Sequence, residues 1–270
     1  MPATQIVKQY GMLMFLAVSF VQRRFFLDYK QKIIEILKNK KDRYPLDSVV
    51  DFKKCTSKDE AAKIDDAIIE LLDSDDPWLL DCAISLCGFD LKIYTAKQKL
   101  LSLAAGEKIR KHEHALGSLF AAFSALEVKE SLEYAVDYLD SAVEDIDAAS
   151  HWIAALSALI SCAPDRAPFY IKRIFVIYYI KSEWNENFGA GWLMSTFVYP
   201  IWWCLSRLDI DGLKALEQEF DSVSGRCKEI YESTLKYAVD TNENFKWICG
   251  QHGINGLSAE VMAAILQRLR

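Results

Sequence analysis

Glycine and proline are scarce in this chain, which has eleven Gly and six Pro among 270 residues. An all-β protein of this length would need many tight turns, and tight turns need Gly, Pro, Asn and Asp at particular positions. About half of the residues (51%) are apolar. Because the chain is rich in Leu, Ala, Lys and Glu, its composition predicts an all-α fold with a large hydrophobic core.

The chain also lacks the motifs on which most enzymes depend. It contains no glycine-rich phosphate loop and no nucleophile motif, so we predict no catalytic residue and no cofactor. His112 and His114 stand two residues apart on a predicted helix, about 200° around its axis. They are poorly placed to share a metal ion, and we predict no metal site. These absences favour a binding protein over an enzyme.

Cysteine is present but shows no paired spacing. The chain has seven Cys, an odd number, and no Cys-x-x-Cys motif. Cys82 and Cys87 are five residues apart, which suits neither a metal pair nor a redox pair on a helix. Most of the cysteines stand among apolar residues, where Cys behaves as a small hydrophobic side chain. The pattern predicts reduced thiols and a cytoplasmic protein.

The apolar run near the N-terminus, residues 12–18, is too short to cross a bilayer. Two interpretations of it stay open. The run could be the core of a signal peptide over residues 1–19, with Ala17 and Ser19 at its cleavage site. We favour a buried helix that covers the open end of a helical array, because the odd number of cysteines argues against export.

Acidic residues exceed basic ones, but unevenly along the chain. The formal net charge is −6. Residues 1–58 hold twelve Lys and Arg against five Asp and Glu, so they carry +7 and the remaining residues carry −13. The body of the protein should therefore repel nucleic acid. The basic N-terminal part either contacts an anionic surface or is only the solvated face of a helix.

Helix start signals recur at a regular interval. Asp76 is a predicted N-cap and Pro77 takes the first helical position, after which the helix runs to a predicted stop at Gly88. Similar starts follow at steps of 35, 36, 36, 38 and 37 residues. A period in the mid-thirties indicates stacked helix pairs. The six second-helix starts lie near residues 76, 111, 147, 183, 221 and 258.

A second series of starts lies between these helices. Ser57 is a predicted N-cap, and Glu60 completes a capping box with it. We predict a single domain, 1–270, in which helices near 4–17 and 19–41 form an N-terminal cap, 1–56, on about six helix pairs, 57–270. Pro200 is predicted to kink or end its helix. The first-helix starts lie near residues 57, 95, 129, 165, 209–211 and 241.

One helix pair resembles a known repeat. Residues 70–83, Glu-Leu-Leu-Asp-Ser-Asp-Asp-Pro-Trp-Leu-Leu-Asp-Cys-Ala, resemble the HEAT-repeat consensus, in which a first helix ends in Leu-Leu and an Asp-Pro turn opens the second. The likeness is degenerate elsewhere, and Leu79-Leu80 stand where HEAT repeats usually have Val-Arg. The Trp-Leu-Gly-Tyr pattern of tetratricopeptide repeats is absent. The resemblance implies an α-α superhelix, a HEAT-like solenoid whose inner face comes mostly from second helices, and no particular function.

Acidic side chains form a stripe on the helix that begins near Lys129. Their spacing of 3, 4, 3 and 4 residues places five carboxylates on one helix face. No Lys or Arg occurs from Glu130 to Asp165, although like charges at this spacing cost roughly a few tenths of a kcal/mol each. We predict that the stripe binds a basic partner, the alternative being a solubilising face. The five residues are Glu130, Glu133, Asp137, Asp140 and Glu144.

Aromatic residues are concentrated between residues 184 and 203, where four of the seven Trp lie. Trp and Tyr are common anchors of protein interfaces. Trp184, Phe188 and Trp192 are spaced at i, i+4 and i+8, which is also typical of a helix face turned toward the core. Two interpretations stay open: a partner-binding surface that includes Trp184, Trp192 and Trp202, or core packing.

These features favour a non-catalytic protein-binding repeat protein whose partner is another protein, a basic one. The acidic body and the lack of catalytic motifs would suit an immunity protein that neutralises a cationic nuclease-type toxin by direct binding. Two alternatives are a HEAT-like DNA-repair glycosylase, which the charge of −13 on the body disfavours, and a membrane-associated adaptor anchored by its N-terminal segment. The sequence predicts no particular oligomeric state.

Overall fold

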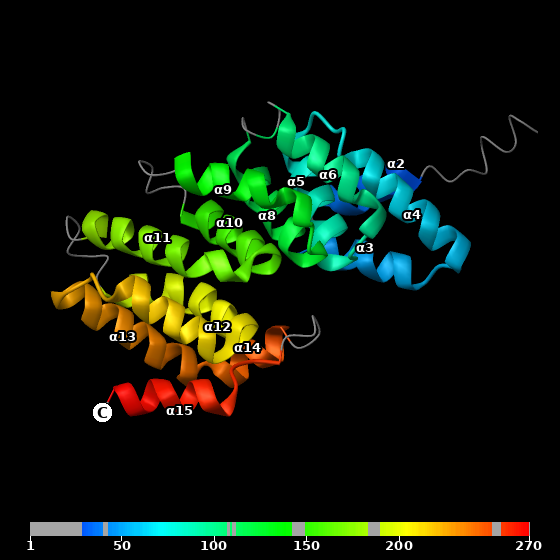
Figure 1. The fold of residues 1–270 in the computed structure, drawn as a ribbon. Coiled ribbons are helices and arrows are strands. Elements are labelled where there is room, and N and C mark those ends of the chain that lie inside the picture. Colours follow the sequence, from blue (N-terminus) through cyan, green and yellow to red (C-terminus); the bar gives the residue numbers. More distant parts are fainter. Residues whose placement is uncertain are drawn as a thin grey trace, which may run out of the picture.

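The computed structural model describes residues 29–39, 43–106, 109, 112–141, 149–182, 190–249 and 255–269. These residues form thirteen α-helices and include no β-strand, so the prediction of an all-α protein is confirmed. Figure 1 shows the helices packed side by side from the N-terminal to the C-terminal end of the described chain. Among the described helices, none has the length and apolar character that a membrane span requires.

Two short helices precede the predicted repeats. α2 (Tyr29–Leu37) packs on α4 (Lys58–Leu71) and buries Ile33. α3 (Pro45–Lys54) begins with proline, which is favoured in the first helical turn because it lacks an N–H. The sequence predicts one helix near 19–41 and does not predict α3, although Pro45 is a helix start signal. The predicted helix over 4–17 lies outside the described residues.

The strongest helix start signals are confirmed. At the start of α4 the Ser57 hydroxyl accepts from the N–H of Glu60, and the Glu60 carboxylate accepts from the N–H of Ser57 at 3.0 Å. At the start of α5 (Pro77–Ser85) the Asp76 carboxylate accepts from the N–H of Trp78 at 3.1 Å. These caps satisfy backbone donors that a helix leaves without partners, and they fix both boundaries.

Gly88 does not end the helix that Asp76 opens, contrary to the prediction. The chain continues as the π-helix η1 (Leu86–Asp90), in which the N–H of Leu91 donates to the carbonyl of Leu86 at 3.0 Å. A Cβ atom at Gly88 would lie 2.3 Å from the Cβ of Ala122 on α8 (Glu113–Leu126). Glycine therefore serves here for close helix packing, not for a helix stop.

The later helices begin close to their predicted starts. The predicted start near 183 lies outside the described residues. The bounds are α6 (Lys97–Ala105) after the 3-10 turn η2 (Tyr94–Ala96), α9 (Leu132–Ser141), α10 (Ala149–Cys162), α11 (Ala167–Ser182), α13 (Gly225–Asp240), α14 (Asn242–Cys249) and α15 (Ala259–Arg268).

The longest helix, α12 (Ala190–Phe220), passes through Pro200 without ending there. Its backbone leaves the helical region at Asp209, with φ 54° and ψ −137°, where the sequence predicts a helix start. The hydroxyl of Ser258, the N-cap of α15, donates to the Asp209 carboxylate. The helix is thus divided at Asp209, close to the predicted start, and the prediction that Pro200 could end the helix is wrong.

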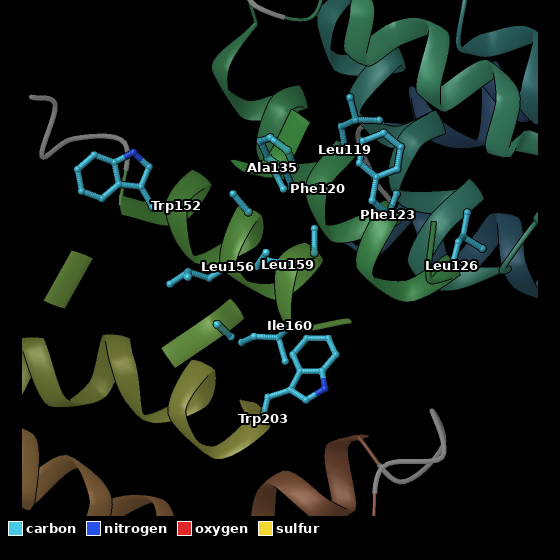
Figure 2. Packing of buried hydrophobic residues seen from close by; sticks show 14 of the residues in the cluster. Leu119, Phe120, Phe123, Leu126, Ala135, Trp152, Leu156, Leu159, Ile160 and Trp203 are labelled. Carbon is cyan, nitrogen blue, oxygen red and sulfur yellow. The ribbon is translucent and has the colours of Figure 1, made fainter. Parts of the chain in front are cut away.

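Buried side chains from every described α-helix belong to one hydrophobic core. α8 packs against α5 and α10, α10 against α9 and α12, and α12 against α11 and α13. Figure 2 shows this packing, with Phe123 on α8, Trp152 on α10 and Trp203 on α12 among the labelled side chains. Because α8, α10 and α12 pack in succession, residues of all three helices can line a shared site.

Candidate functional site

A groove of about 660 Å³ lies where α8, α10, α12 and α14 meet the segment that runs from η1 into α6. We name it the central groove. Its walls come from segments that lie far apart in the sequence. The lining residues are Phe89, Lys92, Tyr94, Lys97, Ala121, Ser124, Ala125, Leu126, Glu127, Ala154, Ser157, Tyr199, Trp203, Arg207, Ile248 and Cys249.

Two unusual backbone turns contribute charged side chains to the central groove. Lys92 follows η1 with φ 50°, and Glu127 is the left-handed C-cap of α8 with φ 49°. A third such residue in the described part of the chain, Asp209, follows Arg207 by two positions. Residues other than glycine seldom adopt this conformation, and where they do, a functional role is a reasonable hypothesis.

The charged residues of the central groove are three cations and one carboxylate. Arg207 of α12 forms an ion pair with Glu127 at 2.5 Å and so ties α12 to the end of α8. The Lys97 ammonium lies over the ring of Tyr94, 5.3 Å from its centroid, a cation–π contact. Within the described residues, neither Lys92 nor Lys97 has a carboxylate partner. The groove therefore has an excess of two positive charges in an acidic chain.

Large apolar side chains stand exposed around the same groove. Phe89 and Tyr94 are 55% and 58% exposed, and Ile248 on α14 is 49% exposed. Exposed apolar groups gathered at a concave site mark binding surfaces, whereas single exposed ones are ordinary. The rim of the central groove thus has the character of a binding surface.

The wall of the groove contains an indole ring whose donor is buried. Trp203 is 7% exposed, and its Nε1–H has no acceptor among the described residues. The neighbouring Trp202 is fully buried, and its Nε1–H donates to Oδ1 of Asn242 at 2.9 Å. A buried donor without an acceptor costs about 1–3 kcal/mol, so the contrast between the two indoles calls for an explanation.

The hydroxyl and thiol groups of the groove are poorly placed for nucleophilic catalysis. Ser157 donates to a backbone carbonyl one turn earlier, and the Ser124 and Ser161 hydroxyls bond to each other at 2.9 Å. All seven cysteines are free, and burial raises the pKa of the Cys249 thiol, which disfavours the reactive thiolate. Burial likewise raises the pKa of Tyr199. Within the described residues, no group of three or more His, Cys, Asp or Glu side chains could hold a metal ion.

The predicted acidic stripe lies on the exposed side of α9 and just before it. The apolar residues of the same helix face the core. The sequence suggested that Asp140 has no counter-charge. In the structure, Arg173 of α11 forms an ion pair with it. Glu144 lies outside the described residues. We name the four described carboxylates the α9 acidic face: Glu130, Glu133, Asp137 and Asp140.

Of the three tryptophans predicted as partner contacts, Trp202 is the one whose side chain lies within the described residues. Trp202 lies in the core, where it packs on Tyr199 and Phe245 with ring centroids 6.0 Å and 5.2 Å away. Because Trp202 is fully buried, it cannot contact a partner at the surface. Trp184 lies outside the described residues, as does the side chain of Trp192.

Sequence reasoning missed the cations and the exposed aromatic residues of the central groove. Lys92 and Tyr94 belong to a segment predicted to follow a helix stop, and Lys97 and Arg207 are ordinary residues of helices. No local pattern marks them, because the groove is assembled from five separate parts of the chain.

No protein-family model matches this chain, and neither a curated protein nor a solved structure matches it. The residues and the geometry of the central groove are therefore the basis for a functional proposal.

Proposed function

We propose that this chain is a non-catalytic protein-binding protein that takes a segment of a partner into the central groove. The observation that carries the proposal is the groove itself, which combines a volume of about 660 Å³ with exposed Phe89, Tyr94 and Ile248. Full burial of a large apolar side chain is worth about 1.5–3 kcal/mol. A partner segment that covers these three residues would therefore have a substantial driving force.

The order of the helices supports a repeat architecture for this protein. We propose that α4 to α15 form a HEAT-like solenoid, in which α5, α8, α10 and α12 act as successive second helices. In such arrays the stacked repeats present one extended inner surface to a partner. The contribution of α8, α10 and α12 to a single groove fits that arrangement. The seven free cysteines favour a reducing compartment such as the cytoplasm.

The chemistry of the groove favours binding over catalysis. Its serines are engaged in hydrogen bonds, and the raised pKa of Cys249 disfavours the thiolate that a cysteine nucleophile needs. The HEAT-like glycosylase alternative gains from the groove cations but lacks support for its chemistry. That activity would need an Asp in the groove, and the one carboxylate there, Glu127, is paired with Arg207.

The proposal can be tested with a displayed library of random eight-residue peptides. The protein should enrich peptides that bind it, and Ala125→Phe, which fills the groove without changing charge, should weaken their binding at least about tenfold, or 1.4 kcal/mol. The control variant Glu133→Lys with Asp137→Lys alters the α9 acidic face and should leave this binding unchanged. Failure to enrich any peptide that depends on position 125 would contradict the proposal.

A second candidate partner is a basic protein on the α9 acidic face. Glu130, Glu133 and Asp137 are exposed there and have no cationic partner among the described residues. A cationic nuclease-type toxin, neutralised by an immunity protein, would be one such partner. Binding to a purified cationic nuclease domain should weaken with salt and with Glu133→Lys plus Asp137→Lys. Binding that ignores both changes would exclude this candidate.

A further inference from the structure

We infer that the segment bound in the central groove is acidic, an extended peptide that places carboxylates near Lys92 and Lys97 and an aromatic or aliphatic side chain against Trp203 and Ile248. The inference rests on the proposed function and specifies the chemistry of its partner. An acidic segment is opposite in charge to the basic partner that the composition of the chain predicts.

The two lysines carry the first part of the argument. Both line the groove, both are partly buried, and neither has a carboxylate partner within the described residues. The Lys97 ammonium is held over the ring of Tyr94, and Lys92 has a left-handed backbone conformation directly after η1. A carboxylate brought between them would form charge-assisted hydrogen bonds without first displacing an internal ion pair.

The Arg207–Glu127 pair gives the groove a polarity. The Arg207 guanidinium is already paired with Glu127, so this part of the lining is close to neutral. An incoming carboxylate would meet repulsion from Glu127 here and attraction at Lys92 and Lys97. The acidic residues of the bound segment should therefore lie over the segment from η1 to α6, with its apolar residues over α12 and α14.

The apolar side of the groove supplies the second part. Trp203 and Ile248 offer an apolar wall, and Phe89 and Tyr94 extend it across the rim. The Nε1 atom of Trp203 is buried behind this wall, so the indole presents its apolar ring and not its donor to a bound segment. A peptide supplies apolar side chains and carboxylates together.

A nucleic acid fits these observations less well than a peptide. Duplex DNA carries one negative charge about every 1.7 Å, and its binding depends on many cations along a track. The central groove has three cations, one of them paired, on a body that carries −13 outside residues 1–58. The experiment must therefore distinguish peptide binding from nucleic-acid binding.

The test selects eight-residue peptides on the wild-type protein and measures their affinity by fluorescence anisotropy. The selected peptides should be rich in Asp or Glu beside Trp, Phe, Leu or Ile. Lys92→Glu with Lys97→Glu should weaken their binding at least about tenfold, a loss of 1.4 kcal/mol. The matched control is Lys58→Glu with Lys236→Glu, two exposed lysines outside the groove, which should change affinity by less than about twofold.

Further variants keep the result interpretable. Lys92→Asn with Lys97→Gln removes charge without reversing it and should give a smaller loss, and circular dichroism confirms that each variant is folded. Trp203→Phe removes part of the apolar ring that lines the groove, and should weaken the same peptides.

Three results would overturn the inference. Groove-dependent peptides that are neutral or basic, or that bind the Lys92→Glu, Lys97→Glu protein equally well, contradict the acidic partner and leave the proposed function standing. A labelled oligothymidylate that binds more tightly than the peptides and competes with them assigns the groove to nucleic acid. Selection that yields no peptide sensitive to Ala125→Phe contradicts the proposed function as well.

Discussion

The α9 acidic face and the central groove are built in opposite ways. One short segment supplies the whole face, at a spacing of three and four residues that places its carboxylates together. The groove takes its lining from five parts of the chain, from Phe89 to Cys249. The face is negative, as the net charge of −6 suggests, and the groove is positive. Net charge therefore describes the whole surface and does not describe a particular site on it.

The same contrast separates the two partner hypotheses. A basic partner would suit the α9 acidic face, and an acidic segment would suit the central groove. The face depends on exposed side chains of one short segment, whereas the groove depends on how α8, α10, α12 and α14 pack. Disruption of core packing should therefore damage the groove far more than any change on the face.

The largest expected effect comes from removal of the core that supports the groove. Trp202 is fully buried and donates to Asn242, which also accepts from the N–H of Leu257 at 2.8 Å. Trp202→Ala should lower the free energy of unfolding by about 3–5 kcal/mol, because it leaves a cavity. Urea unfolding followed by circular dichroism measures the change.

The matched variant on the face is Glu133→Ala, which should stay within about 0.5 kcal/mol of the wild type. Equal losses of unfolding free energy in Trp202→Ala and Glu133→Ala would show that the α9 acidic face depends on packing as much as the central groove does. That result would contradict the difference between the two surfaces.

A smaller effect is expected at the contact between η1 and α8. Gly88→Ala would place a Cβ 2.3 Å from the Cβ of Ala122, so the two segments must move apart. Overpacking of this kind lowers stability by about 1–3 kcal/mol, and it should also weaken peptide binding because Phe89 follows directly. Thermal unfolding and the anisotropy assay measure the two consequences.

Gly191→Ala is the control for this prediction, because a Cβ there meets no atom within 4 Å. It should leave stability unchanged or raise it by up to about 1 kcal/mol. If Gly88→Ala changed neither stability nor peptide affinity, η1 would not be held close to α8. The position of Phe89 would then have no explanation.

The smallest effect compares one ion pair from each surface. Arg207 pairs with Glu127 in the groove, and Arg173 pairs with Asp140 on the face. Double-mutant cycles with Arg207→Gln and Glu127→Gln, and with Arg173→Gln and Asp140→Asn, should each give a coupling of about 0.2–1 kcal/mol, since all four side chains are partly exposed.

Addition of 1 M NaCl should reduce both couplings, because salt screens exposed charges. The groove variant Arg207→Gln should also change the affinity of the selected peptides, whereas Arg173→Gln should not. A peptide affinity that responds to Arg173 instead would place the binding site on the face.

Features that depend on a few neighbouring residues could be predicted from the sequence. The capping box of Ser57 and Glu60 and the Asp76–Pro77 start are formed within one helical turn, so local chemistry fixes them. The amphipathic character of α9 follows from its spacing in the same way. The missed helix α3 had one such signal, Pro45 in its first turn.

Features that depend on contacts between distant segments could not be predicted. Gly88 has the form of a helix stop in the sequence, but its role comes from Ala122, which approaches it on another helix. Trp202 and Trp203 are adjacent in the sequence, yet only one has an acceptor, because Asn242 lies beside that one. α12 continues through Pro200, although proline taken alone predicts a helix end there.

The sequence by itself determined an all-α chain, most helix starts and one acidic helix face, because these follow from composition, caps and the helical period. Tertiary structure decided which residues meet in the central groove and which charge it carries. The physical reason is that packing brings Lys92, Lys97, Trp203 and Ile248 together from separate helices and turns, and no local pattern encodes that meeting.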